Sequence, residues 1–185
     1  MTTARLQLLI VEDDAAHIEA IHRAFETAGM AVEICVANTL REYRASVAAQ
    51  VPDLVVMDLN LPDGRATDVL THPPEDAPFP VVVMTAFGNQ QIVVEVLKAG
   101  ALNYIVKTPE AFALIPETVD LVLREWRLLQ KHKQTKSDLR AVLEATADGI
   151  LAVSSDNKIL FANGRFAKMW KVSTEIISSL SLIHI

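Results

Sequence analysis

The sequence predicts an α/β fold, a doubly wound parallel sheet, followed by a smaller segment of different character. Up to about residue 130, short apolar runs alternate with amphipathic stretches, which is the order of parallel strands joined by right-handed helical crossovers. Four runs, Leu8–Val11, Leu54–Met57, Val81–Met84 and Tyr104–Val106, are apolar throughout and rich in β-branched residues, as in strands buried on both faces of a sheet. The expected strands are Leu6–Val11, Ala31–Val36, Leu54–Met57, Val81–Met84 and Asn103–Val106.

The helices between these strands are indicated by the spacing of apolar residues. In Ala15–Ala28, the residues Ile18, Ile21 and Phe25 fall on one face, and a glycine follows the last residue. The prolines of residues 73–80 exclude a helix interior, so a loop is expected there. The remaining helices are expected near Leu40–Ala49, around Thr67–Thr71 and over Asn89–Lys98.

From Pro116 onward the pattern becomes that of a long helix. Its apolar residues have the 3-4-3 spacing of a helical seam or coiled coil, with a polar interruption at Lys133 and Lys136. We therefore expect a connecting helix through which the chain pairs weakly and in parallel with a second copy. The alternative is a last domain helix followed by a loose linker. The seam consists of Val119, Val122, Trp126 and Leu129, and after the interruption a second seam follows at Leu139, Val142 and Leu143. Because the first part of the helix must pack on the sheet as the last domain helix, only the portion from Trp126 onward is expected to pair.

The end of the chain has the pattern of a small, incomplete α+β segment. Gly149–Val153 and Ile159–Phe161 are expected to form two strands around a turn at Ser154–Asn157, and Asn163 is placed to cap a following helix. Ser178–Ile185 carry no motif. The expected domain limits are 1–128 for the first domain, 116–145 for the connecting helix that overlaps it, and 139–185 for the final segment.

Composition and charge argue against several classes of function. The 185 residues carry a formal net charge of −6 without a lysine and arginine cluster, so no nucleic-acid partner is expected. No apolar run approaches the roughly 18 residues of a membrane span, and no targeting segment is recognised, so a cytoplasmic protein without membrane contact is expected. The single cysteine, Cys35, cannot form an internal disulfide and is expected to be buried.

Polar side chains follow four of the predicted strands at the point where each strand ends. Glu12 and Asp13 follow the first strand and Asp58 follows the third. Thr85 follows the fourth strand and Lys107 the fifth. Because ligand sites in open parallel sheets lie beyond the carboxyl ends of the strands, we expect these side chains to converge.

Carboxylates that gather at one edge repel one another unless they are protonated or bridged by a cation. With only oxygen donors nearby, Mg²⁺ is the expected cofactor. Asp13 and Asp58 are the expected direct ligands, while Glu12 would act through water and Asn60 through its backbone carbonyl. A carboxylate can attack a phosphoryl group and hold it as an acyl phosphate, whose charge a metal ion and Lys107 would offset. Asp58 is therefore the expected phosphoacceptor.

These residues lie in four short segments: Val11–Asp13, Met57–Gly64, Val83–Ala86 and Ala99–Lys107. Together, the segments resemble the receiver domain of two-component response regulators, and the resemblance covers residues 5 to about 128. It implies a flavodoxin-like sheet of five strands and Mg²⁺-dependent phosphoryl transfer from a histidine kinase or phosphotransfer protein. It also implies a signalling module in a phosphorelay rather than an enzyme.

The resemblance further implies a set of phosphoryl-binding and switch residues. In the implied switch, the hydroxyl group of Thr85 moves toward the phosphoryl group while the ring of Tyr104 turns inward. The sequence departs from the family at Thr108, because the family usually has a proline directly after the lysine. The complete implied set is Thr85, Ala86, Tyr104 and Lys107.

The segments Leu139–Val153 and Ile159–Trp170 resemble the beginning of a PAS domain and cover less than half of one. No PAS cofactor follows from so short a match. An output domain, such as a histidine kinase or a nucleotide cyclase, would lie outside this chain.

The sequence leaves two alternatives to the receiver. A phosphatase of the haloacid-dehalogenase type also uses an aspartate nucleophile and Mg²⁺, but it needs a second acid two residues later, where this chain has Asn60. Its nucleophile also usually follows the first strand, whereas Asp58 follows the third. A docking domain that works without phosphate is disfavoured because all the site residues are present.

Overall fold

The structure, a computed structural model, describes residues 5–86, 88, 90–155 and 159–171. The chain divides into two compact units, Met1–Gln130 and Lys131–Ile185. None of the helices in the described part of the chain combines the length and the hydrophobicity that a bilayer crossing requires.

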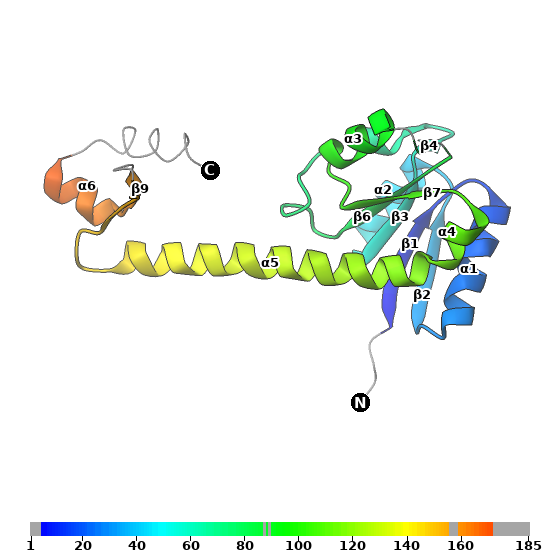
Figure 1. The fold of residues 1–185 in the computed structure, drawn as a ribbon, viewed down its shortest axis with the longest axis horizontal. Helices are drawn as coiled ribbons and strands as arrows, with labels where there is room; N and C mark the ends of the chain where they lie inside the picture. The colour runs from blue at the N-terminus through cyan, green and yellow to red at the C-terminus, as the bar shows by residue number, and fades with distance from the viewer. Residues whose placement is uncertain (1–4, 87, 89, 156–158, 172–185) are drawn as a thin grey trace. The chain divides into compact units, whose positions relative to one another are not determined.

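The first unit is built on a five-stranded sheet in which every pair of neighbouring strands is parallel (Figure 1). The strand order β2-β1-β3-β6-β7 shows that the chain adds strands on one side of β1 and then on the other. This doubly wound topology confirms the predicted fold class. The strands are β1 (Leu6–Val11), β2 (Val32–Ala37), β3 (Leu54–Asp58), β6 (Val81–Thr85) and β7 (Asn103–Val106).

The helices begin and end where the sequence supplies caps. In α1, the side chain of Asp14 accepts a hydrogen bond from the backbone N–H of Ala16, and Gly29 ends the helix in the left-handed conformation. Thr39 caps α2 in the same way as Asp14 caps α1. The predicted helix over Asn89–Lys98 is observed one residue later, and Asn89 itself lies outside the described residues. The helices of this unit are α1 (Ala15–Ala28), α2 (Leu40–Ala49), α3 (Gln90–Ala99), α4 (Pro109–Ala113) and the first part of α5 (Ile115–Ala145).

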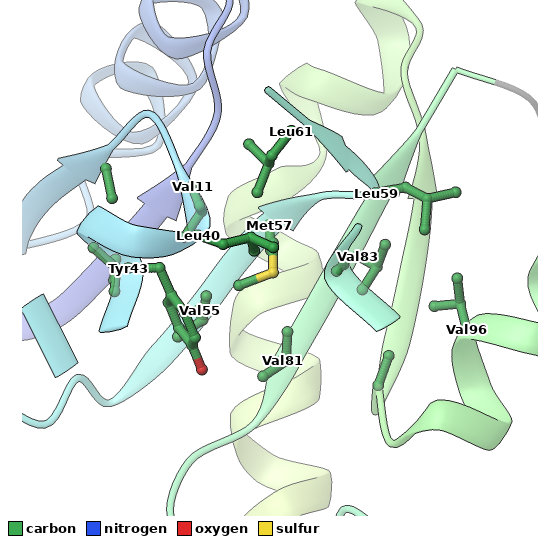
Figure 2. Packing of buried hydrophobic residues seen from close by; sticks show 14 of the residues in the cluster. Val11, Leu40, Tyr43, Val55, Met57, Leu59, Leu61, Val81, Val83 and Val96 are labelled. Carbon is green, nitrogen blue, oxygen red and sulfur yellow. The ribbon is translucent and has the colours of Figure 1, made fainter. Parts of the chain in front are cut away.

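Two apolar cores cover the two faces of the sheet, because successive side chains of a strand point to opposite faces. Val55 and Met57 of β3 belong to one core, with Tyr43 of α2 and Val96 of α3 (Figure 2). Leu54 and Val56 of β3 belong to the other core. Helices α1, α4 and α5 contribute Phe25, Phe112 and Val119 to it, among others. Both faces of β3 are thus fully buried, as its unbroken apolar sequence predicts.

The prediction of a helix around Thr67–Thr71 is wrong. The chain instead forms two short antiparallel strands, β4 (Asn60–Leu61) and β5 (Gly64–Arg65), and a single 3₁₀ turn, η1 (Ala66–Asp68). The chain continues from η1 through turns and loop to β6, and the prolines from Pro73 onward exclude a helix interior in that stretch.

The prediction that Cys35 is buried is also wrong, because its thiol is exposed. Strand β2 lies at the edge of the sheet and has only β1 as a neighbour. The middle of this edge strand is largely uncovered, and Val36 beside Cys35 is 40% exposed. The apolar stretch marked a strand correctly but did not show that the strand is an edge.

Helix α5 runs without interruption from Ile115 to Ala145, which confirms the connecting helix rather than a loose linker. Val119 and Val122 are buried in the core of the first unit, while Trp126 is half-buried. The first part of the predicted seam is therefore occupied within the chain. The most exposed apolar side chains of the later part are Leu128, Leu139 and Val142.

In the second unit, β8 (Leu151–Val153) and β9 (Ile159–Ala162) form the predicted antiparallel hairpin, and α6 (Gly164–Trp170) follows. Of the predicted turn at Ser154–Asn157, the last two residues lie outside the described residues, as does Ser178–Ile185. Asn163 caps α6 by accepting a hydrogen bond from Phe166 N–H, as predicted. Its side-chain amide is fully buried and donates to the carbonyls of Leu143 and Asp148, so it also ties the end of α5 to this unit.

Two glycines provide a test of the packing in the first unit. Gly100 has a φ of +122°, and a Cβ there would overlap the carbonyl oxygen of His72, whereas a Cβ at Gly29 would meet nothing. We expect Gly29→Ala to cost about 1 kcal/mol, the strain of a left-handed alanine, and Gly100→Ala at least about 3 kcal/mol. Urea unfolding of both variants measures the difference in the free energy of unfolding. Equal losses of stability would show that the loop at His72 can move away from the new Cβ at no cost.

Candidate functional site

The three predicted acids meet at the carboxyl ends of β1 and β3, which are neighbours in the sheet. One carboxylate oxygen from each of Glu12, Asp13 and Asp58 lies within 4.8 Å of the others. Glu12 is fully buried and Asp58 is 8% exposed, while Asp13 faces solvent. The convergence expected from the strand ends is therefore observed for all three acids.

Lys107 reaches into this cluster from the end of β7. Its ammonium nitrogen lies 2.7 Å from Asp58 Oδ2 and 2.7 Å from Glu12 Oε2, and its side chain is 8% exposed. Burial alone would lower the pKa of the Lys107 ammonium, but its contacts with the two carboxylates outweigh burial and raise that pKa. A charged lysine therefore bridges the two most buried acids of the site.

Thr85 lies beside the phosphoacceptor candidate, at the end of the next strand. Asp58 pairs in register with Met84, and the backbone carbonyl of Thr85 accepts a hydrogen bond of 2.8 Å from Lys107 N–H. Thr85 is 2% exposed. Because side chains alternate along β6, Thr85 lies on the same face of the sheet as Val83. Tyr104 is the register partner of Val83 on β7, and its half-buried ring packs against the core that contains Val83.

The remaining candidate residues lie at the solvent-exposed edge of the site. Asn60 and Ala86 are exposed, and the backbone N–H of Asn60 lies 3.4 Å from Asp58 Oδ1. Asp14, the third acid of the N-terminal run, caps α1 and lies outside the three-acid cluster. The hydrogen bond from Ala16 N–H is the largest cause of the lowered pKa of Asp14.

One residue at the site was not predicted. His17 Nδ1 lies 3.3 Å from Glu12 Oε1 and 3.3 Å from the ammonium nitrogen of Lys107. The sequence offered one signal, because His17 lies four residues after Asp13, in the first turn of the helix that the acids precede. Its spacing to other histidines was uninformative.

The donor set fits a hard divalent cation. Among the described residues, the cluster found with ligand atoms in mutual reach consists of carboxylates, which suit Mg²⁺. Glu12 Oε2 is buried and lies 2.7 Å from the Lys107 ammonium, which donates a hydrogen bond to the Glu12 carboxylate and offsets its charge.

Comparison with known families agrees with this site. The response regulator receiver domain family matches residues 8–119, which contain every acid of the cluster and Lys107. A PAS domain family matches residues 137–184.

Curated relatives are response regulators of bacteria and archaea. The methanogenesis regulatory protein FilR1 of Methanothrix harundinacea is 32% identical over 67% of this chain and 29% of its own length. The regulatory protein LuxO of Vibrio cholerae is 28% identical over 91% of this chain and 38% of its own length. The acid tolerance regulatory protein ActR of Rhizobium meliloti is 37% identical over 56% of this chain. The chain thus spans well under two thirds of the length of these relatives.

Solved structures show the same fold. The signal receiver domain of a LuxO repressor protein from Vibrio parahaemolyticus has a TM-score of 0.59 at 25% identity, covering 68% of this chain and 95% of that one. A CheY-like receiver domain protein from Methanospirillum hungatei has a TM-score of 0.56 at 27% identity, covering 67% of this chain and 98% of that one. With a doubly wound sheet, three acids and a lysine at its carboxyl edge, and a family match over most of that unit, the chain belongs to the response regulator receiver domain family, followed by a PAS-like segment.

Proposed function

We propose that the first domain accepts a phosphoryl group on Asp58 from a histidine kinase or phosphotransfer protein. The observation that carries this proposal is the contact between the Lys107 ammonium and Asp58 Oδ2, at 2.7 Å in a buried site. In the transfer, a carboxylate oxygen of Asp58 bonds to phosphorus while the bond from phosphorus to the donor nitrogen breaks. The donor imidazole keeps the electron pair, and the product on this chain is an acyl phosphate.

Lys107 would offset negative charge at the site both before and after the transfer. Before transfer its ammonium neutralises Asp58, and after transfer it can donate to a phosphoryl oxygen without leaving the site. Mg²⁺, when bound, would supply a second positive charge for the phosphoryl oxygens. In this proposal Asp13 and Asp58 hold it directly, Glu12 acts through water, and Asn60 contributes its backbone carbonyl.

A metal-dependence measurement tests the proposal. Uptake of a phosphoryl group from acetyl phosphate, followed by intact-mass spectrometry, is expected with Mg²⁺ and not in EDTA. Asp13→Asn should raise the Mg²⁺ concentration for half-maximal uptake by roughly 10–100-fold, because it removes one ligand charge. Asp14→Asn is the matched control, since asparagine also caps helices and Asp14 lies outside the cluster. Equal shifts in both variants would contradict the assignment of Asp13.

The phosphorylated state would be relayed through Thr85 and Tyr104 to the face formed by α3 and β7. Thr85 and Tyr104 share one face of the sheet on adjacent strands, and Tyr104 packs against the core that contains Val96 of α3. A movement of the Thr85 side chain toward Asp58 would open space on that face for the ring. The PAS-like segment and any output domain beyond it would receive this signal through α5.

We also propose that the chain forms a weak dimer through α5, by a seam that keeps the predicted Leu139 and Val142 but uses Leu128 in place of Trp126 and Leu129. Val119 and Val122 are buried within the chain, but Leu128, Leu139 and Val142 are between 59% and 68% exposed. Leu128 and Val142 lie two heptads apart and Leu139 three residues before Val142, so all three fall on one coiled-coil seam. Polar residues between them limit the expected dissociation constant to the micromolar range or weaker, roughly −8 kcal/mol.

Sedimentation of the whole chain tests the dimer. A variant with Leu128→Glu and Leu139→Glu is expected to dissociate at least about tenfold more readily, because it places charges opposite each other in the seam. Val51→Glu, which replaces an equally exposed residue of the first unit, is the control. A wild-type chain that sediments as a monomer at high micromolar concentration would rule out the dimer.

A further inference from the structure

His17 stands at the wall of the candidate site, in the first turn of α1. Its Nδ1 lies 3.3 Å from the Lys107 ammonium nitrogen and 3.3 Å from Glu12 Oε1. Its side chain is 31% exposed, so part of the ring remains open to solvent. His17 thus touches both partners of the buried Lys107–Glu12 ion pair without belonging to the three-acid cluster.

The ring of His17 packs against α4, a helix that begins shortly after Lys107. Thr108 caps α4 by accepting a hydrogen bond of 3.2 Å from Ala111 N–H, and Pro109 occupies the first turn. Phe112 of this helix stacks on His17 with ring centroids 5.2 Å apart and planes tilted by 32°. Lys107 and His17 are therefore linked in two ways. Their side chains are in direct contact, and the helix that follows Lys107 in the sequence places Phe112 against His17.

The Lys107 ammonium has three N–H donors and three neighbours. Asp58 Oδ2 and Glu12 Oε2 lie at 2.7 Å, and His17 Nδ1, which accepts a hydrogen bond when the ring proton is on Nε2, lies at 3.3 Å. A lysine ammonium is a compact charge on a flexible stem of four carbons, so contacts from several directions are needed to fix its position. When a phosphoryl group takes the place of the Asp58 contact, Glu12 and His17 are the two neighbours that remain.

We infer that His17 is a positioning residue for phosphoryl transfer, which keeps the Lys107 ammonium directed at the oxygen of Asp58 that receives the phosphoryl group. The inference rests on the proposed function of Asp58 and adds to it a residue that touches neither the phosphoryl donor nor the acceptor carboxylate. His17 acts through Lys107, and Phe112 acts through His17.

The test is the rate of phosphoryl uptake from acetyl phosphate at saturating Mg²⁺, measured on the full chain by intact mass. His17→Ala is expected to lower the rate about fivefold, which corresponds to about 1 kcal/mol in the barrier. His17→Asn is expected to restore most of the rate, because its short amide side chain again offers a polar atom near Lys107. His22→Ala, on the same helix, is the matched control and is expected to react as the wild type does.

A double-mutant cycle separates positioning from a general structural effect. If His17 acts through Lys107, His17→Ala should add nothing to the loss in Lys107→Ala, because the group that it positions is gone. A full fivefold loss from His17→Ala in the Lys107→Ala background would overturn the inference. A His17→Ala rate equal to that of the wild type would also overturn it, and so would a failure of His17→Asn to recover activity. Absence of uptake by the wild-type chain would instead contradict the proposed function of Asp58.

Discussion

Replacing Asp58 by asparagine is expected to abolish phosphoryl uptake from acetyl phosphate, with a loss of more than about a thousandfold. The amide has nearly the same shape as the carboxylate and keeps one oxygen near Lys107, so the fold should remain intact. It lacks the negative charge that makes the oxygen a nucleophile and lowers the affinity for a divalent cation. Intact-mass spectrometry after incubation with the donor and Mg²⁺ gives the result directly.

The matched control is Asp53→Asn. Asp53 lies before β3 as Asp58 lies at its end, and its carboxylate accepts a hydrogen bond from Gln7 N–H that an amide oxygen can also accept. This variant is expected to take up phosphate at the wild-type rate. A phosphorylated Asp58→Asn chain would show that another residue is the acceptor.

Thr85→Ala is expected to leave Asp58 phosphorylatable but to remove the response of α3 and β7. The Thr85 side chain is buried at the end of β6, one residue beyond the register partner of Asp58, and lies on the same face as Tyr104. Its hydroxyl is the group that can contact the phosphoryl oxygens while its displacement frees space for the ring. Without the hydroxyl, the charge on Asp58 has no proposed route to that face.

Amide chemical shifts on addition of beryllofluoride and Mg²⁺ measure this response. In the wild type, shifts are expected at Glu95–Tyr104 as well as around Asp58, and in Thr85→Ala only around Asp58. Thr85→Ser keeps the hydroxyl and should respond as the wild type does. Equal responses of Glu95–Tyr104 in the wild type and in Thr85→Ala would count against the switch.

The sheet could be predicted from the sequence because four of its five strands contain an unbroken apolar run, Leu8–Val11, Leu54–Met57, Val81–Met84 and Tyr104–Val106. Such runs fit the buried, two-sided positions of β3 and β6, and the strand ends then place the acids and Lys107 at one edge. The same reasoning failed for Cys35. An apolar run indicates a strand, but whether a strand lies at the centre or the edge depends on pairing, which local sequence does not contain.

Helix α4 and the role of His17 were not predicted, for related physical reasons. Pro109 and the polar residues around it indicate a turn, and a helix of one turn leaves too short a pattern to detect. The contact of His17 with Lys107 joins residues that are 90 positions apart, so it appears only when β1 and β7 are placed in one sheet. The connecting helix, by contrast, has a long local pattern, and its predicted limits differ from the observed ones by one residue, at the start.

Mapping of the phosphoryl group tests the central claim most directly. The wild-type chain would be treated with acetyl phosphate and Mg²⁺, reduced with borohydride to convert aspartyl phosphate into homoserine, digested and sequenced by tandem mass spectrometry. The account predicts homoserine at position 58 and at no other aspartate. Homoserine at position 13 or elsewhere, with Asp58 unchanged, would contradict it.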